Sequence, residues 1–207
     1  MSLLYLHGFR SSPASVKAQQ LAAAVNAMPV DLRPRLHVPM LNAGPAADVS
    51  ATAAWIERNV ASPEPTLTIV GSSLGGFYAT HLAERFGTRA VLINPAIRPY
   101  DDLKPYAGPQ TNLYTGETFV VTGAQFDELR KLAVPRITRP ERYLLLVQSG
   151  DEVLDYREAV AFYGGAFQYV EGGGDHAFHR FDAQIPALLR FAGVATTIRR
   201  SPPLERI

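Results

Sequence analysis

Short apolar runs alternate with longer amphipathic segments along most of the chain. Short unbroken apolar runs are typical of strands buried on both faces of a parallel sheet, whereas apolar residues spaced at i, i+3, i+4 and i+7 predict helices. The segments that predict strands are residues 3–6, 36–38, 67–70, 90–93, 143–147 and 167–170. Their alternation with helical segments predicts an α/β fold, with a mostly parallel sheet of about six strands and helices on both faces.

Several helices between these strands carry start and stop signals. Ser12 and Pro13 predict a helix start, because serine is a good N-cap and proline is tolerated at the first helical position. Residues 74–86 predict a helix directly after the third strand. The last helix is expected over about residues 185–191, because Pro186 suits only a first turn.

Residues 98–142 interrupt this rhythm with aromatic residues scattered among prolines and polar residues. We expect them to form a small cap-like insertion over the sheet. The length favours one domain, which we place at residues 1–194. Residues 195–207 show no periodicity, and we expect a flexible tail there.

Composition narrows the class of protein. Of the 207 residues, 47% are hydrophobic and the net charge is +1, which disfavours disorder and a nucleic-acid partner. Cysteine is absent, so disulfides and a cysteine nucleophile are excluded. The N-terminus has no basic region ahead of its first apolar run, and no run is long enough to span a bilayer. These features predict a cytoplasmic protein without a membrane span.

The stretch Gly71-Ser72-Ser73-Leu74-Gly75 fits the pattern G-x-S-x-G and lies between a predicted strand and a predicted helix. Such a junction forces a sharp turn whose middle residue has a strained backbone and a freely projecting side chain. Glycine at the flanking positions relieves the crowding where the chain approaches itself. The pattern predicts a nucleophile elbow with Ser73 as the nucleophile.

A serine hydroxyl needs a base within hydrogen-bond reach, and that base needs an orienting acid. In hydrolases with this motif the chain order is serine, then aspartate or glutamate, then histidine. His176 and His179 both follow the last predicted strand, and His176 comes directly after the stretch EGGGD. We predict His176 as the base and keep His179 as the alternative.

The acid is expected after the fifth predicted strand, where LLLVQSGDEVLDY offers Asp151, Glu152 and Asp155. Asp151 comes just past the end of the strand, where a side chain can reach the site. Asp155 is more typical of a helix entry. We predict Asp151 as the acid, with Asp155 as the alternative.

A tetrahedral intermediate of ester hydrolysis needs two N–H donors. We predict that one is Leu74, which follows the nucleophile. The other is expected in the loop after the first strand, where His7 and Gly8 permit a tight turn and Phe9 follows. We predict Phe9 as the second donor; the alternative is a turn that only ends the strand.

With these residues identified, the chain resembles the YqiA-type esterases, small single-domain members of the α/β-hydrolase superfamily. The matching stretches cover most of residues 3–192: LLYLHGFRSSPAS, IVGSSLGGFYATHLAERF, VLINPAIRPYDDL, NLYTGE, GDEVLDYREAVAFY and GGGDHAF. The resemblance implies a trimmed α/β-hydrolase fold, hydrolysis of carboxylic esters without a cofactor, and catalytic roles for Ser73, Asp151 and His176. The position before the histidine is often asparagine in such proteins and is Asp175 here.

We therefore expect a serine esterase that acts on small-molecule acyl esters through an acyl-enzyme intermediate. An acyl thioesterase or another serine hydrolase is the first alternative, and a non-catalytic binding protein on the same fold is the second. The aromatic residues of the 98–142 insertion are expected to line an acyl pocket or, alternatively, only to pack the insertion onto the sheet.

Overall fold

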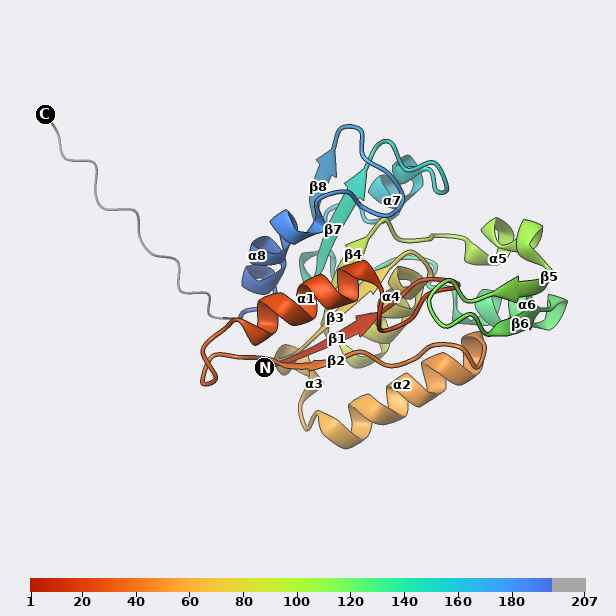
Figure 1. Cartoon of the computed structure of the whole chain (residues 1–207). Coiled ribbons are helices and arrows are strands. Elements are labelled where there is room, and N and C mark those ends of the chain that lie inside the picture. Colours follow the sequence, from red (N-terminus) through yellow and green to blue (C-terminus); the bar gives the residue numbers. More distant parts are fainter. Residues whose placement is uncertain (195–207) are drawn as a thin grey trace, which may run out of the picture.

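A six-stranded parallel sheet forms the centre of the molecule (Figure 1). The computed structural model describes residues 1–194, and the tail expected over residues 195–207 lies outside the described residues. In spatial order the strands are β2 (Arg35–His37), β1 (Ser2–Leu6), β3 (Leu67–Ser72), β4 (Arg89–Ile93), β7 (Tyr143–Gln148) and β8 (Phe167–Glu171). Each matches a predicted segment to within one or two residues, and the predicted α/β architecture is confirmed.

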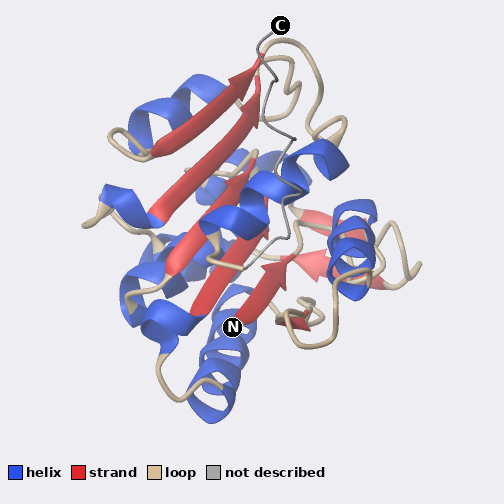
Figure 2. Ribbon diagram, turned by 90° about the vertical axis from the view of Figure 1, so that its left-hand side faces the viewer, coloured by secondary structure: helices blue, strands red, loops and turns tan. Residues whose placement is uncertain are grey.

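Helices cover both faces of this sheet (Figure 2). One face carries α1 (Val16–Asn26) and α8 (Phe181–Phe191), and the other carries α2 (Pro45–Asn59), α4 (Leu74–Phe86) and α7 (Tyr156–Phe162), with the single turn α3 (Pro63–Thr66) before β3. Successive strand side chains point to opposite faces. Leu4 and Leu6 of β1 therefore join the core beneath α4, whereas Leu3 and Tyr5 join the core beneath α1 and α8.

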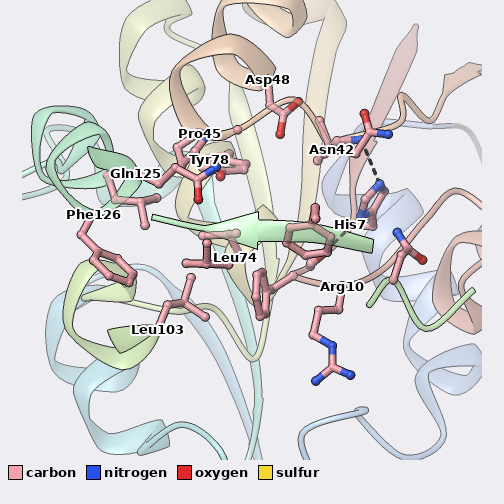
Figure 3. A pocket seen from close by; sticks show the side chains of 18 residues that line it. His7, Arg10, Asn42, Pro45, Asp48, Leu74, Tyr78, Leu103, Gln125 and Phe126 are labelled. Atoms are coloured by element: carbon pink, nitrogen blue, oxygen red, sulfur yellow. Dashed lines mark hydrogen bonds between the residues drawn. The ribbon is translucent and has the colours of Figure 1, made fainter. Parts of the chain in front are cut away.

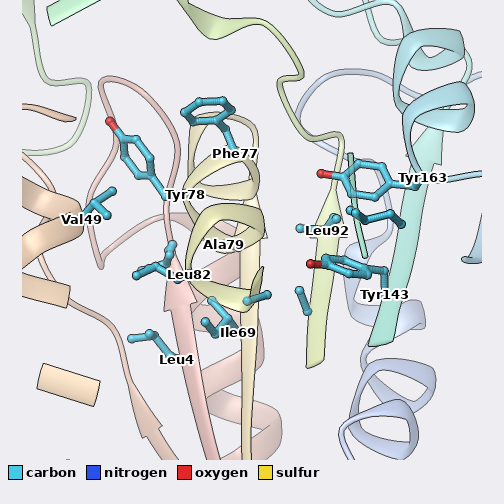
Figure 4. Close-up of a cluster of buried hydrophobic side chains, with 14 of the residues drawn as sticks. Leu4, Val49, Ile69, Phe77, Tyr78, Ala79, Leu82, Leu92, Tyr143 and Tyr163 are labelled. Atoms are coloured by element: carbon cyan, nitrogen blue, oxygen red, sulfur yellow. The ribbon is translucent and has the colours of Figure 1, made fainter. Parts of the chain in front are cut away.

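The larger core lies between the sheet and α4 (Figure 4). Leu4, Ile69 and Leu92 come from three neighbouring strands and lie in one cluster with Leu82 of α4, and all four are fully buried. Burying each such side chain stabilises the fold by about 1.5–3 kcal/mol. This packing fixes the beginning of α4 relative to the ends of the strands.

The strand registers bring distant parts of the chain to one edge of the sheet. Ser72 pairs with Ile93, Ile93 pairs with Leu146, and Gly71 pairs with Leu6. Because the strands are parallel, the segments that follow β1, β3, β4 and β7 all leave the sheet at the same edge, where α/β proteins bind their ligands.

The first helix starts later than predicted. α1 begins at Val16, three residues after Pro13. The Ser12 carbonyl accepts the Ser15 N–H and the Ser12 hydroxyl accepts the Ala14 N–H, each at 3.0 Å, so residues 12–15 form a separate turn. Ser12 caps this turn instead of the helix.

The last helix starts earlier than predicted, at Phe181, so that Pro186 lies inside it. Proline removes one N–H from the helical hydrogen-bond pattern. The buried side chains of Phe181, Ile185 and Leu188 pack α8 onto the sheet and outweigh that loss.

Residues 98–142 form short elements outside the main sheet. They are α5 (Pro99–Asp102), η1 (Lys104–Tyr106), β5 (Gly108–Thr111), β6 (Thr118–Val121), α6 (Gly123–Leu132) and η2 (Pro140–Arg142). β5 and β6 pair antiparallel as a separate hairpin, and α6 packs against α2 and α5. Figure 1 places α5, β5, β6 and α6 on the side toward which β1 points, whereas η2 directly precedes β7. The sequence predicted an insertion here but no strands within it.

Candidate active site

Ser73 lies at the sharp turn between β3 and α4. Its backbone has φ +56° and ψ −123°, a conformation that costs a residue with a side chain about 1–3 kcal/mol. Neighbouring backbone groups hold this conformation, because the Ser73 N–H donates to the Ile93 carbonyl at 3.0 Å and the Ser73 carbonyl accepts the Ala96 N–H at 3.1 Å. The turn directs the serine side chain toward the carboxyl edge of the sheet.

Close backbone approach requires glycine on both sides of this turn. A Cβ atom on Gly71 would overlap the Gly75 carbonyl, and a Cβ atom on Gly75 would overlap the Leu6 carbonyl. A larger residue at either position would force α4 away from the strands. The two outer glycines of the G-x-S-x-G pattern thus have the steric role that the sequence suggested.

The side chains of Ser73, His176 and Asp151 form one hydrogen-bonded chain. Ser73 Oγ lies 3.0 Å from His176 Nε2, and His176 Nδ1 lies 3.0 and 2.9 Å from the two carboxylate oxygens of Asp151. A carboxylate only accepts, so Nδ1 carries the ring proton and Nε2 is free to accept from the serine hydroxyl. The Asp151 side chain is 2% exposed and the His176 side chain is 22% exposed.

The neighbouring acid, Asp155, has different partners. It accepts the Arg157 N–H at 3.0 Å at the start of α7 and forms an ion pair with the Arg157 guanidinium at 2.8 Å. Asp151 Oδ1 also accepts the N–H groups of Val153 and Leu154 at 2.9 and 2.8 Å, which fixes its carboxylate beside His176.

Two buried amide side chains hold the loop that carries His176. Asn94 Nδ2 donates to the carbonyls of Asp175 and His176 at 2.9 and 3.2 Å, and Asn94 Oδ1 accepts the Gln148 N–H at 3.0 Å. The Gln148 side chain donates to the His179 carbonyl and accepts the His179 N–H, both at 2.8 Å. Neither residue is predicted from the sequence, where each appears only as a polar residue at the end of a buried strand.

His7 is a structural residue of the loop after β1. Its Nδ1–H donates to the Gly8 carbonyl at 3.0 Å, and its Nε2 accepts the Leu41 N–H at 3.1 Å. Burial lowers the pKa of the His7 ring. A neutral ring with its proton on Nδ1 satisfies both hydrogen bonds.

The same loop packs directly against Ser73. A Cβ atom on Gly8 would lie only 3.1 Å from Ser73 Cβ. Among the residues that the structure describes, neither the Phe9 N–H nor the Leu74 N–H donates a hydrogen bond. Both N–H groups are therefore without an acceptor within residues 1–194.

Two cavities adjoin this turn. The open cavity has a volume of about 700 Å³, and both Ser73 and His176 line it. The apolar cavity has a volume of about 80 Å³ and extends from Phe9 and Leu74 toward α2, α6 and the hairpin (Figure 3). Its walls are mainly apolar side chains: Leu41, Leu103, Phe119, Val121, Phe126 and Leu129.

Asp48 borders the apolar cavity and is 8% exposed. Burial raises the pKa of its carboxyl from 3.8 to about 6, although the Ala43 N–H bound to the carboxylate acts in the opposite direction. Between pH 3.8 and about pH 6, the folded state therefore binds more protons than the unfolded state. The free energy of unfolding of the wild type falls as the pH rises through this range.

An Asp48→Asn variant cannot ionise at this position. We expect its free energy of unfolding to rise relative to the wild type by up to about 3 kcal/mol between about pH 4 and about pH 7. Urea unfolding of both proteins at the two pH values measures this difference. A difference that stays constant with pH would contradict the raised pKa.

Two kinds of feature are absent from residues 1–194. No helix there is both long and apolar enough to cross a membrane. No group of three or more histidine, aspartate or glutamate side chains in that range could hold a metal ion.

The family model described as "Uncharacterised protein family (UPF0227)" matches residues 2–193. The chain belongs to this family. The match spans all six strands, the turn at Ser73 and the loop at His176. It confirms the YqiA-like resemblance predicted from the sequence motifs.

Solved structures with the same architecture include hydrolases and esterases. The esterase domain of a Rhodothermus marinus protein is 18% identical, with a TM-score of 0.67 over 92% of this chain and 85% of that chain. Mouse alpha/beta hydrolase domain-containing protein 10 is 16% identical, with a TM-score of 0.64 over 91% and 89% of the two chains. Est1E from Butyrivibrio proteoclasticus with bound ferulic acid is 13% identical, with a TM-score of 0.65 over 92% and 88%. At these identities the likeness shows the fold, which is that of the α/β hydrolases.

Proposed function

We propose that this protein is a serine esterase that hydrolyses carboxylic esters through an acyl-enzyme intermediate. The observation that carries the proposal is the hydrogen-bonded chain from Ser73 through His176 to Asp151, with 3.0 Å between Ser73 Oγ and His176 Nε2. The fold supports it, because structural neighbours include an esterase domain and Est1E.

In the first half-reaction Ser73 Oγ attacks the ester carbonyl carbon while His176 Nε2 takes the hydroxyl proton. Asp151 holds the Nδ1–H and stabilises the imidazolium. The oxyanion accepts hydrogen bonds from the Leu74 and Phe9 N–H groups. The tetrahedral intermediate then expels the leaving alcohol, whose oxygen takes the proton from Nε2, and Ser73 is left acylated.

In the second half-reaction water attacks the acyl carbon of the Ser73 ester. His176 Nε2 takes a proton from this water and returns it to Ser73 Oγ when the carbon–oxygen bond to the serine breaks. The products are the carboxylic acid and the free serine hydroxyl.

Each of the two cavities binds one half of the ester. The leaving oxygen must approach His176 Nε2, and His176 lines only the open cavity. Leu74, on the oxyanion side, lines only the apolar cavity. The acyl chain therefore occupies the apolar cavity, and residues 98–142 act as the cap over it.

Filling the apolar cavity should shorten the preferred acyl chain. Val121 is buried and lines this cavity, whereas its neighbour Val120 is exposed and does not. We expect Val121→Phe to lower kcat/KM for p-nitrophenyl hexanoate by at least about tenfold relative to p-nitrophenyl acetate, because each lost methylene contact removes about 0.8 kcal/mol.

Val120→Phe is the matched control and should leave the hexanoate-to-acetate ratio unchanged. Equal effects of both substitutions on this ratio would place the acyl chain elsewhere.

A panel of p-nitrophenyl esters and acyl thioesters of the same acyl groups tests the reaction class. We expect steady-state release of p-nitrophenol from the esters. Faster turnover of the thioesters would favour a thioesterase, and no turnover by the folded protein would favour a binding protein.

A further inference from the structure

The turn between β5 and β6 has no role in the proposed chemistry. It consists of residues 112–117, with the sequence NLYTGE, which is one of the stretches that resemble the YqiA-type esterases. Leu113 and Tyr114 of this turn line the open cavity together with Ser73 and His176. The turn is therefore part of the wall that faces a leaving group in this cavity.

The side chain of Asn112 attaches this turn to the loop that follows β1. Asn112 is buried; its Nδ2 donates to the Ser11 carbonyl at 2.8 Å, and its Oδ1 accepts the Tyr114 N–H at 2.9 Å. The Leu113 N–H donates to the Arg10 carbonyl at 2.9 Å. The backbone of Leu113 and Tyr114 is therefore fixed on the loop that packs against the proposed nucleophile.

Three large apolar side chains at the open cavity are exposed to water. Leu113 is 69% exposed and Tyr114 is 46% exposed, and Val16 at the start of α1, which lines the same cavity, is 64% exposed. We call these three side chains the apolar rim. Single exposed apolar side chains are ordinary, whereas several at one hollow are typical of a binding site. An apolar ligand that covers the apolar rim removes apolar surface from water, which is favourable.

The charged side chains of the open cavity do not favour a charged leaving group. Lys17 Nζ donates to the Ala177 carbonyl at 2.7 Å, and Arg10 Nε donates to the Thr111 carbonyl at 3.0 Å, so both cations already have protein acceptors. A charged ligand is attracted by an excess of the opposite charge. Cationic and acidic side chains instead occur in equal number along the walls: Arg10, Lys17 and Arg180 against Glu152, Asp175 and Asp182.

We infer that the leaving group is an apolar alcohol, such as an arylalkyl alcohol, whose carbon skeleton packs against the apolar rim. The inference rests on the proposed esterase function, because that reaction places the leaving oxygen beside His176 and its substituent in the open cavity. An alcohol without such a skeleton leaves the apolar rim in water and gains no binding free energy from it. Leu113 and Tyr114 are then specificity-determining residues.

Three butyrate esters test this inference: phenylethyl butyrate, ethyl butyrate and methoxyethoxyethyl butyrate. They share the acyl group and the first two carbons of the alcohol, and the third ester has a long but polar alcohol. We expect kcat/KM of the wild type to be at least about tenfold higher for the phenylethyl ester than for either of the others, because only its alcohol buries apolar surface on the apolar rim.

Serine at position 113 or 114 removes apolar surface and keeps the backbone hydrogen bonds of the turn. We expect Leu113→Ser and Tyr114→Ser each to lower the ratio of kcat/KM for phenylethyl butyrate to that for ethyl butyrate about fivefold. Val120→Ser is the matched control, because Val120 lies on the same hairpin, is also exposed and lines neither cavity. It should leave the ratio unchanged.

Equal kcat/KM values for the three esters in the wild type would overturn the inference and leave the esterase proposal intact. Ratios that change no more in Leu113→Ser and Tyr114→Ser than in Val120→Ser would also overturn it. A wild type that sediments as a dimer beside a monomeric Leu113→Ser variant would assign the apolar rim to a second copy of the chain instead. No hydrolysis of any of the esters by the folded wild type would contradict the esterase function itself.

Discussion

Replacing Ser73 by alanine is expected to lower kcat for ester hydrolysis at least about 10³-fold. In the proposed mechanism the serine oxygen forms the covalent bond to the acyl group, and the variant has no other nucleophile in that position. KM should change little, because the cavities that hold the ester remain. Steady-state kinetics with p-nitrophenyl butyrate measure both constants.

Ser72→Ala is the matched control for this variant, since Ser72 is the adjacent residue and also lines the open cavity. We expect its kcat to stay within about tenfold of the wild type. Undiminished turnover by a folded Ser73→Ala protein would contradict the assignment of the nucleophile.

The second large effect is expected at Asp151. Asp151→Asn should lower kcat about 10³–10⁴-fold, because an amide can donate to His176 Nδ1 and so favour the tautomer that cannot accept the serine proton. Asp155→Asn should change kcat only a few-fold, since asparagine is also a good N-cap for α7. The two changes have the same chemistry and lie four positions apart.

Urea unfolding of both variants separates a loss of chemistry from a loss of fold. If Asp155→Asn reduces kcat more than Asp151→Asn while both remain folded, the role of the acid belongs to Asp155.

The residues of the proposed site could be predicted because their signals are local. The turn at Ser73 needs glycine on both sides, and residues 71–75 contain both glycines and the serine. The ends of the apolar runs indicated where the strands stop, and parallel strands bring their carboxyl ends to one edge. The structure accordingly brings Ser73, Asp151 and His176 together.

Asn94 and Gln148 could not be predicted in the same way. Asn94 reaches the loop at His176 across more than 80 residues of sequence, and its contact with the Gln148 N–H spans 54 residues. Such contacts depend on the tertiary structure and leave no periodic pattern. In the sequence, each of the two residues is recognisable only as a polar residue at the end of a buried strand.

The hairpin within residues 98–142 was missed because its first strand has poor strand signals. β5 is Gly108–Thr111, with the sequence GPQT, and glycine and proline are both depleted in strands. β5 forms because it pairs with β6. The apolar residues Phe119 and Val121 of β6 face the apolar cavity.

Covalent labelling with a fluorophosphonate tests the central claim most directly, because such probes react with a serine that an adjacent base activates. We expect one probe to attach per chain, and mass spectrometry of the digested protein should locate it on Ser73. Attachment to another residue, or no reaction of the folded wild type, would contradict the account.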